Sequence, residues 1–290
     1  MAIIENTFVY INIVMLIISF PGNILIIAVN ILDFCKNRRL PVSDQLIFGC
    51  SVFSLLHGLV EIVQFAIEEY HLITAHILMY FNIGTICFSA LLNIHFCLKI
   101  VNINHWFYIG LQRRFSMLIY WPLMTFLLGY TLINFLSLLY IKQKVLLNTT
   151  SAVVESQACS WSLFICMSMS VFDTLLCLVS TLTIVIHLFQ HMKRIQENTM
   201  GSRSPNMEVY IRTVITVTTL LAANILLFSS MFFRCILVAL NEMFGLHLFS
   251  ILISTCHIFS SYFIIKGTKK LDTVLVKVLN QCLLLLKPNQ

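Results

Sequence analysis

The chain has 290 residues, of which 59% are apolar and only 10% are charged. Soluble domains carry about 25% charged residues, so this composition excludes an ordinary soluble protein and indicates a membrane protein. The net charge of +6 would suggest nucleic-acid binding only if the basic residues formed one patch, and because they are spread along the chain we expect no nucleic-acid partner.

Seven charge-poor apolar stretches are each long enough to cross a bilayer, because a hydrocarbon core of about 30 Å requires about 20 helical residues. Glu61 and Asp173 are the only carboxylates within them. In chain order the stretches are 8–32, 45–67, 72–98, 115–141, 162–190, 213–233 and 243–265. We therefore predict an all-α membrane protein, a seven-transmembrane helix bundle that forms a single domain over residues 1–290.

The basic residues alternate between the two sides of these stretches. Fifteen of the 18 Lys and Arg residues lie in segments 33–44, 99–114, 191–212 and 266–290. Cytoplasmic loops retain Lys and Arg during membrane insertion, so the N-terminus is predicted outside and the C-terminus in the cytoplasm. No basic residue precedes the first stretch, which is longer than the apolar segment of about 7–15 residues in a signal peptide. We expect this stretch to be retained as a span.

The predicted external loop 142–161 contains an N-glycosylation acceptor, Asn148-Thr149-Thr150. Cys159 lies in the same loop, and Cys235 lies at the outer end of the sixth predicted span. A disulfide between these two is compatible with an oxidising exterior, and the sequence leaves the pairing open.

The tail is predicted to form an amphipathic helix on the inner leaflet. Its apolar positions 271, 274, 275, 278 and 279 follow helical spacing, and Asp272, Lys277 and Gln281 interrupt them. Such a pattern is typical of a helix that lies in the interface, and it is too short and too charged for an eighth span.

Polar side chains at membrane depth are candidates for function, because each is costly in lipid. Glu61, Gln64 and Glu68 share one face of the predicted second span. This face either lines a binding pocket or reaches the interface. Asn134 and Asn224 are expected to bond between helices, and Asp173 is expected to have a partner that the sequence does not identify.

Enzyme signatures are absent from the sequence, so we expect no enzyme, no cofactor and no metal site. There is no H-E-x-x-H, no G-x-S-x-G and no nucleotide-binding loop. His187 and His191 are four residues apart beside Lys193 and Arg194, a position that favours ordinary interfacial histidines over a zinc pair.

The inner end of the third predicted span carries the most specific motif. It lacks Asp-Arg-Tyr, and the seventh span lacks Asn-Pro-x-x-Tyr, so the commonest class of G-protein-coupled receptor is disfavoured. Residues 96–104 instead read FCLKIVNIN. This stretch resembles the Phe-x-Leu-Lys-Ile-Ala-Asn-Phe-Ser motif of the taste receptor type 2 family, the bitter taste receptors. Further similar stretches are 22–23, 30, 39–40, 44–45, 111–114, 191–196 and 201–205.

The resemblance implies a receptor of the plasma membrane that binds bitter small-molecule agonists in the outer half of its bundle. It also implies coupling to a heterotrimeric G protein, gustducin-like or of another inhibitory class. Asn82 matches the family's ligand-contacting asparagine, and Leu78 replaces the tryptophan one turn outward. Depth and helical face alone add four further pocket candidates, Glu61, Gln64, Phe249 and Leu252. The candidates for G-protein coupling lie at the inner loops and are Lys99, Arg113, Arg114, His191, Lys193 and Arg194.

The sequence also departs from the family pattern. Ser54 stands at the place of the usual arginine in span two, and Asn224 replaces the tyrosine of span six. Near the end of span seven, Ser260 and Lys269 are all that remains of two family patterns. These changes affect internal packing and predict a divergent member.

Two alternatives stay open at this point. A vomeronasal type 1 receptor is the nearest rival, although the missing cysteine at the outer end of span three and the Leu-Lys-Ile-x-Asn stretch weigh against it. A small transporter would use Glu61 and Asp173 along a pathway, but the sequence has no internal repeat of the kind that transporters show.

Overall fold

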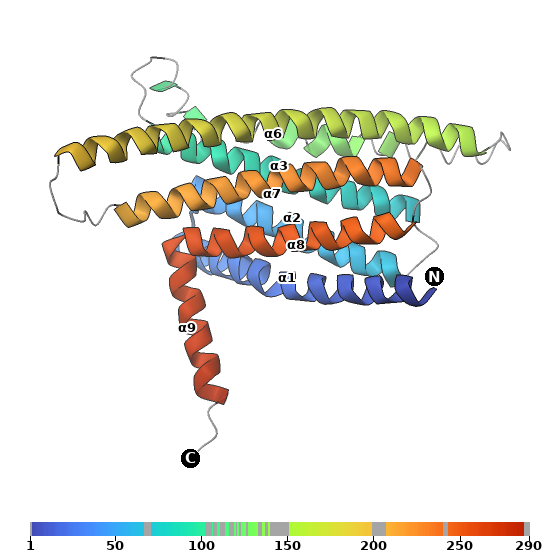
Figure 1. The fold of residues 1–290 in the computed structure, drawn as a ribbon, viewed down its shortest axis with the longest axis horizontal. Coiled ribbons are helices and arrows are strands. Elements are labelled where there is room, and N and C mark those ends of the chain that lie inside the picture. The colour runs from blue at the N-terminus through green and yellow to red at the C-terminus, as the bar shows by residue number, and fades with distance from the viewer. Residues whose placement is uncertain are drawn as a thin grey trace.

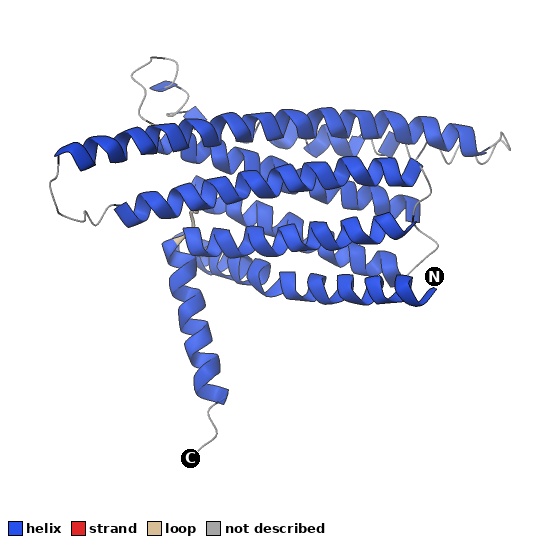
Figure 2. Cartoon of the chain, in the orientation of Figure 1, coloured by secondary structure: helices blue, strands red, loops and turns tan. Residues whose placement is uncertain are grey.

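The computed structural model describes residues 2–66, 71–101, 151–198, 207–239 and 243–286, together with scattered positions between 106 and 139. Regular structure in these described parts is α-helical, and no strand occurs among them (Figure 2). In chain order the helices are α1 (Ala2–Asn37), α2 (Val42–Ala66), α3 (His71–Ile100), α6 (Ser151–Asn198), α7 (Met207–Ala239), α8 (Met243–Gly267) and α9 (Lys269–Leu286).

The long helices lie side by side along one axis and form a bundle, while α9 projects steeply from one end (Figure 1). Helix α1 packs between α2 and α8, α2 packs on α3, and α7 packs on α8, α6 and α3. Helix α3 buries a larger share of its apolar span than any other described membrane-length helix, so it lies at the centre of the described bundle.

Six of the described helices are long and apolar enough to cross a membrane. They are α1, α2, α3, α6, α7 and α8, and they contain six of the seven predicted spans. The predicted fourth span, 115–141, falls in a region that is described only in part. Within it, Leu123–Leu132 form a shorter apolar helix.

Helix α6 corrects the predicted loop boundaries. It has 48 residues and extends through Ser151 at one end and Asn198 at the other, so parts of the predicted loops 142–161 and 191–212 are helical. The segment 191–198 contains Met, Lys, Arg, Gln and Glu, which favour helix, and adding a residue to an existing helix avoids the cost of nucleation. Hydropathy therefore indicates where a helix lies in hydrocarbon but not where it ends.

Small residues allow α2 and α3 to approach closely. The ring of Phe88 on α3 lies directly over Gly49 of α2, and the ring of Phe53 on α2 lies directly over Gly84 of α3. A Cβ atom at either glycine would overlap the opposing ring. Without a hydrophobic driving force between helices in lipid, this interlocking of rings and glycines is a principal source of packing energy.

The predicted tail helix is present as α9, which begins two residues after α8 ends. The backbone N–H of Asp272 donates to the Thr268 carbonyl at 3.0 Å. The negative charge of Asp272 in the first turn also interacts favourably with the helix dipole. Leu271 is buried, and Val274 and Leu275 pack against the core of the bundle. The first two turns of α9 are thus anchored, and the remainder extends away.

Candidate functional site

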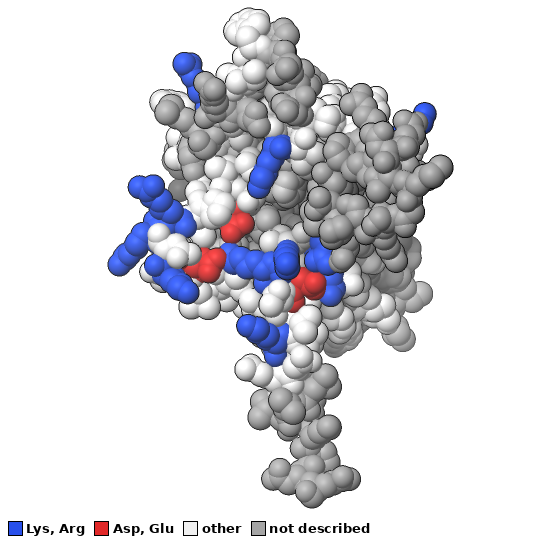
Figure 3. All heavy atoms as spheres, turned by 90° about the vertical axis from the view of Figure 1, so that its left-hand side faces the viewer, with Lys and Arg blue, Asp and Glu red and all other residues white. Residues whose placement is uncertain are grey.

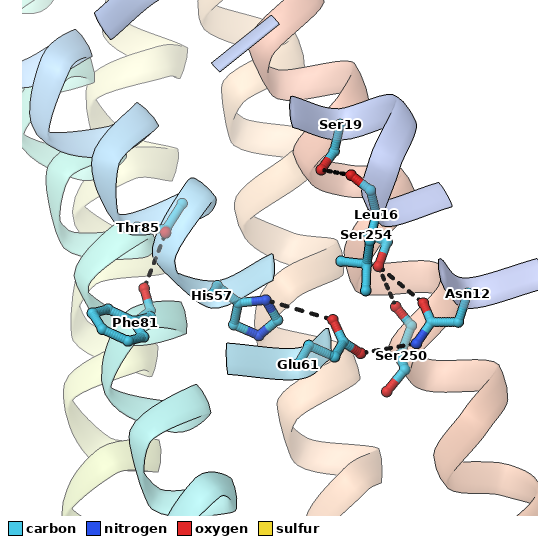
Figure 4. A network of polar contacts seen from close by, with 9 residues as sticks. All are labelled: Asn12, Leu16, Ser19, His57, Glu61, Phe81, Thr85, Ser250 and Ser254. Atoms are coloured by element: carbon cyan, nitrogen blue, oxygen red, sulfur yellow. Dashed lines mark hydrogen bonds and ion pairs between the residues drawn. The ribbon is translucent and has the colours of Figure 1, made fainter. Parts of the chain in front are cut away.

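A cluster of five buried polar residues joins α1, α2 and α8 toward the end of the bundle opposite α9. Its members are Asn12, His57, Glu61, Ser254 and His257, and together they are called the α1–α2–α8 cluster. The amide Nδ2 of Asn12 donates to Glu61 Oε1 at 3.0 Å. The Ser254 hydroxyl donates to Asn12 Oδ1 at 3.1 Å and lies 3.0 Å from the Ser250 carbonyl (Figure 4).

Two of the five members of this cluster are histidines. His57 precedes Glu61 by one helical turn, and its Nδ1 atom lies 3.8 Å from Glu61 Oε2. The ring centroid of His57 lies 5.1 Å from that of His257 on α8. Glu61 is 1% exposed, and a carboxylate at this depth is costly unless it is paired and hydrogen-bonded. Asn12 donates one hydrogen bond to this side chain, and the imidazole of His57 lies beside its second oxygen.

Sequence reasoning identified Glu61 but missed the other four members. The signals that could have found them are the four-residue spacing of His57 and Glu61 and the polar face of Ser250, Ser254 and His257 on α8. Asn12 gives no such signal, because its partners are 49 and 242 residues away.

The predicted pocket residues on α3 face the interior of the bundle. Leu78 and Asn82 lie one turn apart and are 1% and 2% exposed. The Asn82 Oδ1 atom is buried and forms no hydrogen bond within the described residues. Gln64 on α2 is half-buried. Leu78, Asn82 and Glu61 are thus all buried, on the adjacent helices α3 and α2.

The two predicted residues on α8 behave differently from each other. Phe249 is half-buried and stacks on Phe233 of α7, with ring centroids 5.5 Å apart. Leu252 is 37% exposed and lines a groove of about 620 Å³ between α7 and α8, where Phe259 and Leu226 are also exposed. Leu252 was predicted to line the agonist pocket, but its side chain faces this groove rather than the interior of the bundle.

A second buried junction joins α3, α6 and α7. The Cys177 sulfur accepts hydrogen bonds from Asn93 Nδ2 at 2.6 Å and from Asn224 Nδ2 at 3.3 Å. The predicted interhelical role of Asn224 is confirmed, whereas the side chain of Asn134 lies outside the described residues. Asp173 precedes Cys177 by one turn, and its buried Oδ2 has no hydrogen-bond partner in the described part of the chain.

An ion network anchors α9 to four helices at the opposite end of the bundle. The Lys270 ammonium contacts Asp33 of α1 and lies 3.1 Å from Asp44 of α2. Asp272 lies 2.8 Å from Lys266 of α8 and 3.6 Å from Arg212 of α7. These six residues, called the α9 ion network, are partly exposed rather than buried.

The charges of the α9 ion network stabilise one another. Burial of the Lys270 ammonium opposes its charge, yet hydrogen bonds to Asp33 and Asp44 outweigh this effect and raise the pKa of Lys270. The hydrogen bond with Lys266 holds the pKa of Asp272 below its ordinary value, against an opposing effect of burial. Both groups are consequently charged at neutral pH.

The comparison with known families decides the identity of the bundle. The model of the taste receptor protein (TAS2R) family matches residues 1–283. The chain belongs to this family. Taste receptor type 2 member 114 of Mus musculus is 23% identical over 257 residues, covering 79% of this chain and 80% of the relative.

Two further relatives match over nearly the whole chain. Taste receptor type 2 member 104 of Rattus norvegicus is 22% identical over 282 residues and covers 90% of this chain and 91% of its own. Member 10 of Pan troglodytes is 23% identical over 295 residues, with coverage of 96% and 95%. The family assignment disfavours both the vomeronasal type 1 and the transporter alternatives.

Three of the predicted coupling residues are exposed in this family member, namely Lys99, Arg114 and Lys193. Lys99 also lines a cavity of about 430 Å³ at the end that carries α9, together with Thr213, Thr216 and Thr268. The side chains of Arg113, His191 and Arg194 lie outside the described residues, as do Asn148, Cys159 and Cys235.

Proposed function

We propose that this family member is a G-protein-coupled receptor that detects bitter small molecules outside the cell and acts at the plasma membrane. The observation that carries the proposal is the family match over residues 1–283. The six membrane-length helices support a multi-pass membrane protein, and nothing in the sequence indicates an enzyme.

We infer a seven-span topology with the N-terminus outside and the C-terminus in the cytoplasm. Helix α3 ends at the end of the bundle that carries α9, and α6 begins at the opposite end (Figure 1), so the intervening chain is expected to cross once more. The positive-inside rule supports a cytoplasmic location for the α9 end, where Lys and Arg side chains gather (Figure 3).

The agonist is proposed to bind in the outer half of the bundle, among Leu78, Asn82 and the α1–α2–α8 cluster. The support is that these side chains face the interior and carry the few polar groups that a site for small molecules requires. Gln64 and Phe249 are proposed at the outer edge of this site. Leu252 is left out of the refined site, because its side chain lines the exposed groove instead.

Binding is proposed to favour one arrangement of the helices over another, because a ligand shifts an equilibrium only through different affinities for the two states. Lys99, Arg114 and Lys193 would then contact a heterotrimeric G protein, gustducin-like or of another inhibitory class, together with Arg113, His191 and Arg194. The exposure of the first three supports this role. Asn148 is proposed to carry an N-linked glycan.

The function is tested by measuring intracellular calcium in cells that express the chain with a promiscuous chimeric G protein. A panel of bitter compounds is expected to contain at least one that gives a dose-dependent response, absent from cells without the receptor. Silence across the panel, with receptor confirmed at the cell surface, would contradict the proposal. Asn148→Gln serves as a separate control for the glycan, which an endoglycosidase mobility shift reports.

A further inference from the structure

We propose that the corner formed by the end of α1 and by α9 is a binding surface for anionic lipid headgroups of the inner leaflet. The surface consists of five exposed basic residues, Lys36, Arg38, Arg39, Lys269 and Lys277, and is called the basic corner. The agonist and G-protein contacts proposed above include none of these five residues, so the inference goes beyond the proposed function.

Positive charges outnumber negative ones at the end of the bundle that carries α9, which favours a negatively charged ligand there. The described acids here are Asp33, Asp44 and Asp272, and each already contacts a cation of the α9 ion network. The described parts of the chain show no acidic partner for any residue of the basic corner, so five positive charges remain available. Figure 3 shows the same arrangement, with the acids in the middle of this end and Lys and Arg side chains projecting around them.

The position of the basic corner matches the level of lipid headgroups. Lys36 lies in the last turn of the membrane-length part of α1, which ends at Asn37, and Lys269 follows α8, which ends at Gly267. Lys270 connects the two segments through Asp33 and Asp44. Arg38 has a φ angle of 57°, and its N–H donates to the Phe34 carbonyl at 2.8 Å, so this left-handed residue closes α1.

Helix α9 offers an apolar surface beside these charges. Val278 and Leu279 are 40% and 52% exposed although they lie within two residues of Lys277. The helix leaves the bundle at a steep angle (Figure 1) and so runs roughly parallel to a membrane that the bundle crosses. Exposed apolar side chains next to surplus cations fit an interfacial helix whose charges contact phosphate and carboxylate headgroups. An acidic protein segment would satisfy the charges but not the apolar residues.

The test measures lipid retention rather than signalling. Receptor is reconstituted in vesicles of equal parts phosphatidylcholine and phosphatidylserine, extracted in mild detergent, and the two lipids retained per receptor are quantified by mass spectrometry. The triple variant Lys36→Gln, Arg38→Gln, Arg39→Gln is compared with a control that removes the same charge elsewhere at this end, Lys99→Gln, Arg114→Gln, Lys193→Gln. A third variant carries Lys269→Gln and Lys277→Gln.

Retention of phosphatidylserine is expected to fall by up to about fivefold for each cation removed from the basic corner, while phosphatidylcholine is unchanged. The control triple is expected to retain wild-type amounts, and high salt is expected to reproduce the loss. Equal retention by the basic-corner variants and the control would overturn the proposal. Loss of G-protein signalling with normal phosphatidylserine retention would also overturn it, and would assign the surface to an acidic protein. Unchanged thermal unfolding of each variant excludes misfolding as the cause.

Discussion

The α1–α2–α8 cluster and the α9 ion network both connect helices that are distant in the sequence, but they do so with different chemistry. The first is fully buried and uses one carboxylate with an amide, a hydroxyl and imidazoles. The second is partly exposed and uses formal charges of both signs. Hydrogen bonds are expensive to break in the buried site, whereas solvent screens the ion pairs at the end of the bundle.

The α9 end of the bundle can therefore rearrange more easily than the buried cluster. The ion pair between Asp272 of α9 and Arg212 of α7 can exchange for water at small cost, so the inner end of α7 can separate from α9. The α1–α2–α8 cluster is buried and has no such exchange with water.

Asn12→Ala should give the largest loss of stability, because it removes the amide that donates to the Glu61 carboxylate and accepts from Ser254. Loss of a buried hydrogen bond that leaves its partner unsatisfied costs about 1–3 kcal/mol. The measurement is thermal unfolding of ligand-free receptor in nanodiscs. Adding Glu61→Gln should recover part of the loss, because it removes the carboxyl group that Asn12 no longer satisfies. No recovery in the double variant would show that the contact between Asn12 and Glu61 is not the source of the loss.

Ser254→Ala tests the contact between α8 and α1 in the same cluster. It deletes the 3.1 Å hydrogen bond to Asn12 Oδ1 and should lower the free energy of unfolding by about 1 kcal/mol. The matched control is Ser230→Ala, an equally buried serine whose hydroxyl donates to the Leu227 carbonyl of its own helix at 2.8 Å. Equal losses for the two serines would mean that the contact between α1 and α8 contributes nothing specific.

Asp272→Asn should change stability by less than about 1 kcal/mol, because exposed ion pairs contribute little. Its expected effect is on signalling: releasing Arg212 and Lys266 loosens the inner end of α7, so signalling without agonist should rise. Thr273→Ala, at the next and exposed position, serves as the control. Basal signalling that stays at the wild-type level at equal surface expression would show that this contact does not restrain the receptor.

The stability supplied by the α9 ion network should not vary between about pH 5 and pH 9. The lowered pKa of Asp272 means that its contribution is present above its ordinary value, about 3.9, and is lost only as the pH falls through the lower folded value. The raised pKa of Lys270 means that its contribution is lost only as the pH rises above about 10.4. The check is the difference in free energy of unfolding between wild type and Asp272→Asn, measured across this pH range. A difference that changes between pH 5 and pH 9 would contradict the prediction.

Six of the seven spans could be predicted from the sequence, because a helix in hydrocarbon must be apolar along its length. The ends of α6 could not, because helices continue freely into water. Glu61 was visible as a costly carboxylate, but its partners Asn12 and Ser254 come from other helices. Leu252 was chosen for its depth, but the direction of its side chain could not be predicted, because the sequence of α8 does not reveal which face meets α7.

The most direct test of the account is the dose–response of an agonist for receptors with substitutions in the two halves of the bundle, at equal surface expression. Asn82→Ala should shift the half-maximal concentration upward and leave the maximum unchanged, because it alters binding. Lys193→Gln should lower the maximum and leave the half-maximal concentration unchanged, because it alters coupling. An unchanged half-maximal concentration for Asn82→Ala, or a shifted one for Lys193→Gln with a normal maximum, would contradict the division of the molecule into a binding half and a coupling half.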